Sequence, residues 1–125
     1  MMKKIISLGC IVFILFSVCT CHAFASNETI TDIEYFDDGS YGVTTEKYAY
    51  SLLATSNTIT KTKRYKHYDS NNNLDWEASI TATFSYNGVT ASCTSVSKSH
   101  TIYDSSWKLT SSSASKNGAT ATGGF

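Results

Sequence analysis

The sequence predicts an all-β domain, folded as an antiparallel β-sandwich or a strongly curled meander of six to seven strands. Apolar residues occupy every second position from Leu74 to Tyr86, which is the period of a half-buried strand and excludes an amphipathic helix. Asn-Gly pairs at 87–88 and 117–118 are typical of tight hairpin turns. The chain has no proline, so nothing interrupts the hydrogen bonding of long strands.

Residues 1–25 are predicted to be a secretory signal peptide. Lys3 and Lys4 form a short basic region, and the run from Ile5 to Cys21 that follows carries no charge. Ala23-Phe24-Ala25 then offers the small residues that signal peptidase requires. Cleavage after Ala25 leaves a single β domain over residues 26–125, secreted and active outside the cell or at its surface. An uncleaved anchor is the alternative, because about 17 apolar residues can just span a bilayer.

Cleavage would leave Cys93 as the one cysteine of the mature chain, since Cys10, Cys19 and Cys21 depart with the signal peptide. The sequence therefore predicts no disulfide, in spite of the oxidising compartment, and an apolar core must hold the fold. A lone cysteine in a secreted protein can be a nucleophile or pair with a second chain. The position of Cys93 on the apolar face of a strand favours a buried, inert side chain.

The first strands are expected at Ile30 to Phe36 and at Tyr41 to Leu53, separated by the turn-forming run Asp37-Asp38-Gly39-Ser40. A further strand is expected from Thr58 to Tyr68, and it is closed by the polar run from Asp69 to Asn73. No segment has a helical period of sufficient length. These patterns predict a succession of antiparallel strands joined by short turns.

The strand from Leu74 to Tyr86 is expected to turn at Asn87-Gly88 through a two-residue type I′ turn. The apolar positions that follow shift from odd to even before Val96, which predicts a β-bulge near Ser95. The expected cross-strand pairs are Tyr86 with Val89, Phe84 with Ala91, and Ala82 with Cys93.

Beyond this hairpin, Trp107 and Leu109 are expected to open another strand, after the apolar position Ile102. Asn117-Gly118 then makes a second tight turn into a last strand over Ala119 to Phe125.

Ten basic and ten acidic side chains balance, which gives no indication of nucleic-acid binding. The charges are nevertheless segregated, because residues 26–46 hold only acids and residues 47–68 only bases. This segregation allows charge complementarity between neighbouring strands, lysine protection of a sheet edge, or a basic stripe that binds an anionic polymer such as a cell-wall glycan or teichoic acid. The candidate polyanion-binding residues are Lys61, Lys63, Arg64 and Lys66.

Strand alternation divides these four residues between two faces, with Lys61 and Lys63 on one and Arg64 and Lys66 on the other.

The sequence gives little support for a catalytic or metal site. Nothing in the sequence places His67 or His100 beside Cys93, and no Gly-x-Ser-x-Gly elbow is present. Asp37-Asp38-Gly39 lacks the spacing of an EF-hand loop, which favours an Asx turn over a calcium site. We therefore expect no enzymatic activity, no cofactor and no metal.

The region from Tyr68 to Ala121 resembles a bacterial family. It carries Tyr68-Asp69-Ser70-Asn71 and Trp76, then Asn87-Gly88 before Cys93, and finally Ile102-Tyr103-Asp104 before Trp107. This order is similar to that of small secreted Ser/Thr-rich β proteins of Gram-positive, clostridia-like bacteria. The resemblance implies a signal peptide followed by a β domain and assigns no activity. It also implies a further strand after the second hairpin, so the strand ending at Phe125 is expected to be short, exchanged, or completed by another molecule.

The functional expectation is a secreted, non-enzymatic module that binds a partner with tyrosines and charges on a rigid sheet. The expected partner is an anionic cell-wall polymer or glycan, and neither nucleic acid nor lasting membrane insertion is expected. Self-association through edge strands is a further expectation, because no proline guards those edges. The alternative function is that of a small secreted toxin or bacteriocin-like effector.

Overall fold

The computed structural model describes residues 4–6, 11–14, 28–53 and 56–125. The predicted cleavage site at Ala23 to Ala25 lies outside the described residues. Strands and turns make up the described residues, and helices are absent from them, so the all-β prediction is confirmed. Accordingly, no helix in this part of the chain is long and apolar enough to cross a membrane.

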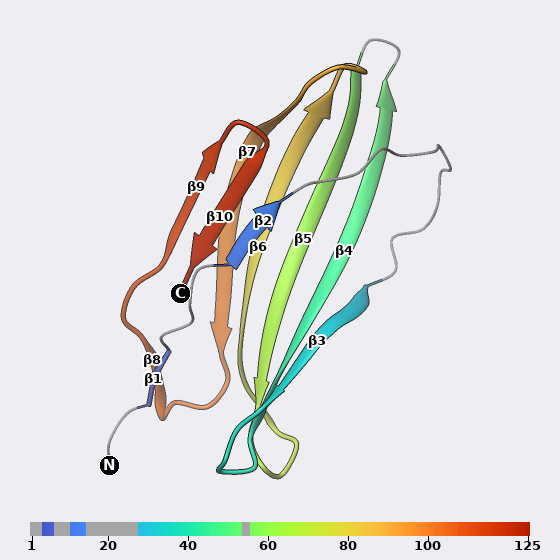
Figure 1. The fold of residues 1–125 in the computed structure, drawn as a ribbon. Helices are drawn as coiled ribbons and strands as arrows, with labels where there is room; N and C mark the ends of the chain where they lie inside the picture. Colours follow the sequence, from blue (N-terminus) through green and yellow to red (C-terminus); the bar gives the residue numbers. More distant parts are fainter. Residues whose placement is uncertain (1–3, 7–10, 15–27, 54–55) are drawn as a thin grey trace.

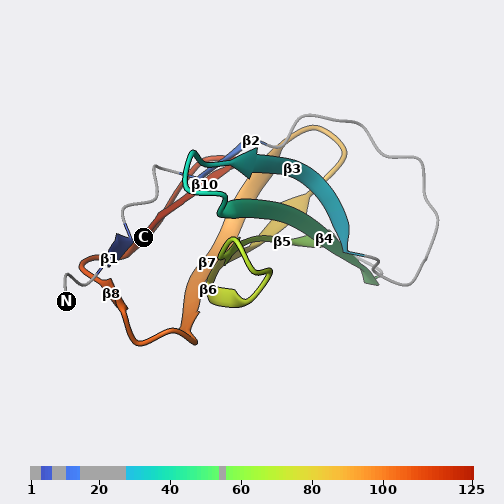
Figure 2. The same ribbon diagram turned by 90° about the horizontal axis from the view of Figure 1, so that it is seen from below.

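The main sheet is antiparallel and has five strands that are adjacent in the order in which they occur in the sequence, β3-β4-β5-β6-β7 (Figure 1). Its strands are long and curved, as the view from below shows (Figure 2). Their bounds agree closely with the sequence prediction. They are β3 (Thr29–Tyr35), β4 (Tyr41–Leu53), β5 (Ser56–Tyr68), β6 (Leu74–Tyr86) and β7 (Ala91–Ile102).

A second, smaller sheet has the order β2-β10-β9, and both of its strand pairs are antiparallel. It lies beside β6 and β7 in Figure 1 and covers part of one face of the main sheet, which we call the inner face. A parallel pair of short strands, β1 and β8, completes the sheets. The strands of these two sheets are β1 (Lys4–Ile6), β2 (Ile11–Ile14), β8 (Trp107–Leu109), β9 (Ser113–Asn117) and β10 (Thr120–Gly124).

The core follows from the alternation along β6. The even-numbered side chains from Trp76 to Phe84 are buried, whereas the odd-numbered ones from Glu77 onward are partly exposed. The even positions face the smaller sheet, where Ala121 of β10 and the following Phe125 are also buried. The buried apolar residues are Tyr65, Trp76, Ala78, Ile80, Ala82, Phe84, Cys93, Ala121 and Phe125.

The hairpin between β6 and β7 corrects the predicted register. Tyr86 pairs with Ala91, not with Val89, and residues 87–90 form the loop. The side-chain oxygen of Asn87 accepts hydrogen bonds from the backbone amides of Val89 and Thr90, at 3.0 and 2.8 Å, and so stabilises this longer loop. Val89 consequently leaves the apolar face and is 87% exposed.

The longer loop also changes the remaining predicted pairs, because Phe84 lies opposite Cys93 and Ala82 opposite Val96. The expected β-bulge is confirmed. The register shifts between Cys93 and Ser95, so that Thr94 is the extra residue. This shift returns Val96 to the same face of the sheet as Cys93.

Candidate functional site

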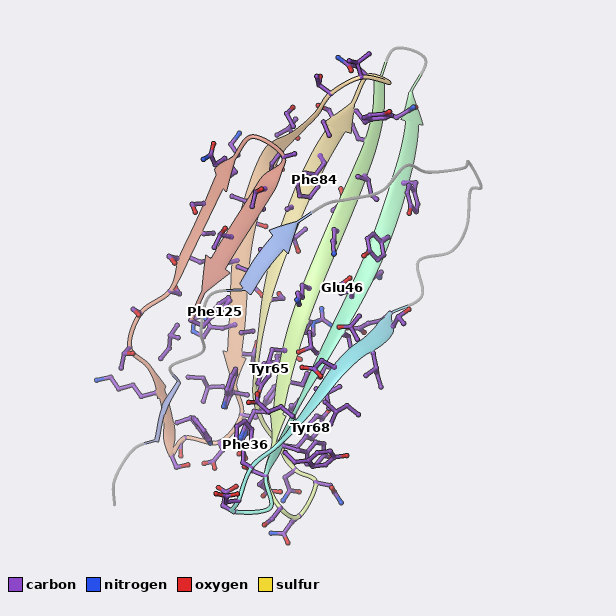
Figure 3. The ribbon with its side chains drawn as sticks, viewed as in Figure 1. Phe36, Glu46, Tyr65, Tyr68, Phe84 and Phe125 are labelled. Carbon is purple, nitrogen blue, oxygen red and sulfur yellow. The ribbon has the colours of Figure 1, made fainter. Side chains whose placement is uncertain are left out.

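The predicted basic residues lie on both faces of β5. Lys61 and Lys63 belong to the inner face, where Lys63 lies directly opposite Glu46 of β4 and Lys61 lies opposite Tyr48. The Lys61 ammonium lies 3.0 Å from the Glu46 carboxylate and that of Lys63 lies 3.9 Å from it. Lys61 is only 8% exposed. Figure 3 shows Glu46 midway along the sheet.

A tyrosine completes this inner-face charge cluster. The Tyr48 hydroxyl donates a hydrogen bond of 2.7 Å to Glu46, and the Lys61 ammonium lies 5.2 Å from the centre of the Tyr48 ring. Burial acts to raise the pKa of Glu46, but the hydrogen bonds from Tyr48 and Lys61 outweigh it and lower that pKa. The cluster holds a carboxylate and an ammonium in their charged forms and so stabilises the pairing of β4 with β5.

Arg64 and Lys66 lie on the opposite face, which we call the outer face. The Arg64 guanidinium lies 3.4 Å from the carboxylate of Glu28. Glu28 also accepts a hydrogen bond from the Thr45 hydroxyl, which is the main cause of its lowered pKa. Charge complementarity between strands therefore accounts for Lys61, Lys63 and Arg64, and the four predicted cations do not form one surface.

The outer face carries a feature that the sequence analysis did not identify, a row of three tyrosines. Tyr35 pairs with Tyr41 across β3 and β4, and Tyr41 pairs with Tyr68 across β4 and β5. The Tyr41 and Tyr68 rings stack with centroids 5.0 Å apart and planes 12° apart, while Tyr35 and Tyr41 are 6.0 Å apart. The row crosses the lower end of the sheet, where Figure 3 labels Tyr68.

The turn after β5 supports this tyrosine row. Asp69 accepts hydrogen bonds from the backbone amides of Asn71 and Asn73, at 2.8 and 2.9 Å. This arrangement holds Asn72 at a φ of 65°, and its side chain accepts a hydrogen bond of 3.2 Å from the Tyr41 hydroxyl. The central ring of the row is therefore fixed at both its face and its hydroxyl.

Exposed apolar side chains extend the row along β3. A β-bulge at Thr31 places Ile30 opposite Thr45 and Ile33 opposite Val43, so that both isoleucines lie on the outer face. Ile30 is 60% exposed, Ile33 43% and Tyr35 76%. Exposed apolar and aromatic groups that lie together mark a binding surface more often than scattered ones do.

A buried polar cluster lies on the other side of the same end of the sheet. His67 Nδ1 lies 3.1 Å from Asp75 Oδ2, and the Trp107 indole donates a hydrogen bond of 3.2 Å to the same oxygen. The His67 ring stacks on Trp76 with planes 1° apart. Phe36 lies 5.7 Å from the same ring. The cluster joins β5, β6 and β8 on the face of the sheet opposite the tyrosine row.

The residues considered for catalysis and metal binding are dispersed. Cys93 lies opposite Phe84 of β6, whereas His67 lies opposite Trp76 of β6. Phe84 and Trp76 are eight residues apart, so Cys93 and His67 are separated by about 26 Å along the sheet at about 3.3 Å per residue. Asp38 accepts hydrogen bonds from the amide and hydroxyl of Ser40, which is the expected Asx turn. Among the described residues, His, Cys, Asp and Glu side chains nowhere gather in a set of three that could hold a metal ion.

Cys93 provides a test of the packing of β7. Its side chain is buried, and burial raises the pKa of the thiol. We expect a thiol reagent such as Ellman's reagent to label the native protein at least about tenfold more slowly than the unfolded protein, because the reactive thiolate is both scarce and covered. The measurement is the labelling rate at pH 8 with and without denaturant. Equal rates would contradict the buried position.

Comparisons with protein-family models, with curated proteins and with solved structures found no match. The resemblance to secreted Gram-positive proteins therefore stays a prediction. The geometry of the outer face is the observation from which a function can be argued.

Proposed function

We propose that the mature protein is a secreted, non-enzymatic binding module, a small two-layer β-sandwich whose outer face binds an anionic glycan of the cell wall. The single observation that carries this proposal is the row of Tyr35, Tyr41 and Tyr68 across three neighbouring strands. The toxin or effector alternative has no comparable feature in its favour.

A row of tyrosines suits a chain of sugar rings. The face of an aromatic ring is electron-rich and attracts the slightly positive C–H groups on the flat side of a sugar. Tyrosine also supplies a large contact area at a small cost in side-chain entropy, and stacking already restricts two of these rings. A linear polymer lying across β3, β4 and β5 would contact the exposed ring of Tyr35 and then the outward edges of Tyr41 and Tyr68, because the stacking of these two rings on each other covers one face of each.

The basic residues of the outer face favour an anionic polymer over a neutral one. Arg64 and Lys66 precede Tyr68 on the same face of β5. The three residues are spaced two positions apart, which is about 6.6 Å at about 3.3 Å per residue. Lys66 forms no ion pair with the residues that the structure describes. Of the four cations predicted from the sequence, Lys66 is thus assigned to ligand binding, Arg64 to its ion pair with Glu28, and Lys61 and Lys63 to the pairing of β4 with β5.

Two pairs of matched variants test this assignment in a pull-down on purified cell walls. We expect Tyr35→Ala and Lys66→Ala each to weaken binding by roughly three- to tenfold, as expected for one aromatic or one ionic contact. The controls are Tyr50→Ala and Lys63→Ala, which make the same chemical changes on the inner face. Tyr50 is 50% exposed, and its removal should leave binding unchanged.

Salt dependence separates the charged from the aromatic contribution. Binding of an anionic polymer should weaken as the sodium chloride concentration is raised, because salt ions screen the attraction between exposed charges. At 0.1 M salt this attraction decays over about 10 Å. The Lys66→Ala variant should show a shallower dependence than the wild type. Binding that does not respond to salt, or that responds only to the inner-face variants, would refute the proposal.

A further inference from the structure

One edge of the main sheet is open along β3. Within the described part of the chain β3 pairs with β4 alone, so its other side has no neighbouring strand there. All seven residues of β3 are exposed. Figure 1 shows β3 at one margin of the main sheet, whereas the smaller sheet packs on β6 and β7 near the other margin. The edge of β3 can therefore be reached by a partner.

The hairpin between β3 and β4 determines which backbone groups lie on this edge. The Phe36 amide donates a hydrogen bond of 2.9 Å to the Ser40 carbonyl of the turn. Backbone groups that point toward β4 alternate with groups that point away from it. The amides and carbonyls of Ile33 and Tyr35 therefore point to the open edge. An added antiparallel strand would form two hydrogen bonds with each of these residues.

The side chains along this edge differ between the two faces. Ile33 and Tyr35 lie on the outer face and are 43% and 76% exposed. Asp32 and Glu34 alternate with them and lie on the inner face. Successive side chains of an added strand would thus lie in turn beside apolar groups and beside carboxylates.

The two carboxylates have no basic partner in the part of the chain that the structure describes. Both act on the buried Tyr65 hydroxyl, because burial first, and then the charges of Glu34 and Asp32, raise the pKa of Tyr65 to about 12. The two lysines on the inner face of β5 lie at Glu46 instead. This uncompensated negative charge beside an open edge favours a basic partner.

We propose that β3 binds an extended segment of a partner protein in which basic residues alternate with apolar ones, and adds it to the main sheet as a further strand. Its basic side chains lie beside Asp32 and Glu34. Its apolar side chains lie beside Ile33 and Tyr35. The same carboxylates would come together if two β3 strands paired, so they select against a second copy of this chain. The proposal goes beyond glycan binding and shares only Tyr35 with it.

Two synthetic peptides of the same composition test the proposal against the full chain labelled with nitrogen-15. In one peptide three lysines alternate with three valines, and in the other the lysines precede the valines. Only the alternating peptide can place its charges on one face of an added strand. We expect it to bind at least about fivefold more tightly than the block peptide. It should slow hydrogen exchange at the amides of Ile33 and Tyr35, but not at those of Asp32 and Glu34, which β4 already bonds.

Matched variants separate the backbone contribution from the charged one. Ile33→Pro removes an outward-pointing amide, which an edge strand tolerates, and should weaken binding of the alternating peptide at least about tenfold. Ile33→Ala keeps the amide and should weaken it at most about threefold. Glu34→Gln should weaken it roughly two- to fivefold, as expected for one exposed ion pair. Glu77→Gln makes the same change on the outer face of β6 and should have no effect.

Equal binding of the two peptides would show that charge attraction alone acts, and would overturn the proposal. So would Ile33→Pro binding as tightly as Ile33→Ala, or unchanged exchange at Ile33 and Tyr35 with millimolar peptide. Protection of these amides that rises with protein concentration, without peptide, would assign the edge to a second copy of the chain instead. Failure of the cell-wall pull-down leaves these measurements intact, because the Ile33 amide and Glu34 take no part in it.

Discussion

Replacing Asp75 by alanine is expected to lower the free energy of unfolding by about 3 kcal/mol or more. Asp75 is 4% exposed. One of its carboxylate oxygens serves both His67 Nδ1 and the Trp107 indole. Removal of the carboxylate would leave the buried His67 nitrogen and the partly buried Trp107 indole without the oxygen that both contact.

Chemical denaturation followed by tryptophan fluorescence measures this loss, because Trp76 and Trp107 both lie at the cluster. Glu77→Ala is the matched control. It removes a carboxylate two residues further along β6, where the side chain is only partly buried, and should change stability by no more than about 0.5 kcal/mol. A similar small effect for both variants would show that the Asp75 carboxylate does not hold the cluster together.

The position of Asp75 shows why the alternation in β6 predicted the strand but not the cluster. Strict alternation places Asp75 on the wet face together with Glu77. In the structure Leu74 pairs with Tyr68 and Trp76 with His67, so Asp75 is the extra residue of a β-bulge and turns inward. Such a bulge depends on the partners that Asp75 finds in the folded state, one of them 32 residues away in the sequence.

The strands themselves were predictable because their signals are local. Period-two patterns and turn residues placed the bounds of β4 and β6 correctly, since burial of one face and the preference for positive φ act within a few residues. The loop after Tyr86 was predicted wrongly. An Asn-Gly pair also fits a longer loop in which the asparagine side chain accepts backbone hydrogen bonds.

The tyrosine row required knowledge of register, which is not a local property. Tyr41 and Tyr68 stand at the outer ends of two predicted strands, and their pairing follows once the hairpin between β4 and β5 is known to be regular along its whole length. Similarly, alternation separated Lys61 and Lys63 from Arg64 and Lys66. It could not identify Glu46 as the partner of the first two, because strand pairing alone brings them together.

The second large change in stability is expected where β10 of the smaller sheet packs on β6 of the main sheet. Ile80 is fully buried on β6, and a methyl group added at Gly123 would overlap its side chain. Ile80→Ala should therefore cost about 2–5 kcal/mol through the cavity that it leaves. Gly123→Ala should cost about 1–3 kcal/mol through overpacking. The two losses have opposite causes, since one variant removes volume at the contact and the other adds it.

The double variant Ile80→Ala/Gly123→Ala is expected to be more stable than the sum of the single effects predicts, by about 1 kcal/mol or more, because the new methyl group fills part of the space that Ile80 vacates. Denaturant midpoints of the four proteins in this cycle measure the coupling. Gly124→Ala is the control, since a methyl group there would meet only the Ser113 hydroxyl at an ordinary 3.4 Å. Strict additivity would mean that β10 does not pack on Ile80 in solution. Coupling at Gly123 without an effect at Gly124 would require β10 to present Gly123, and not its neighbour, to the main sheet.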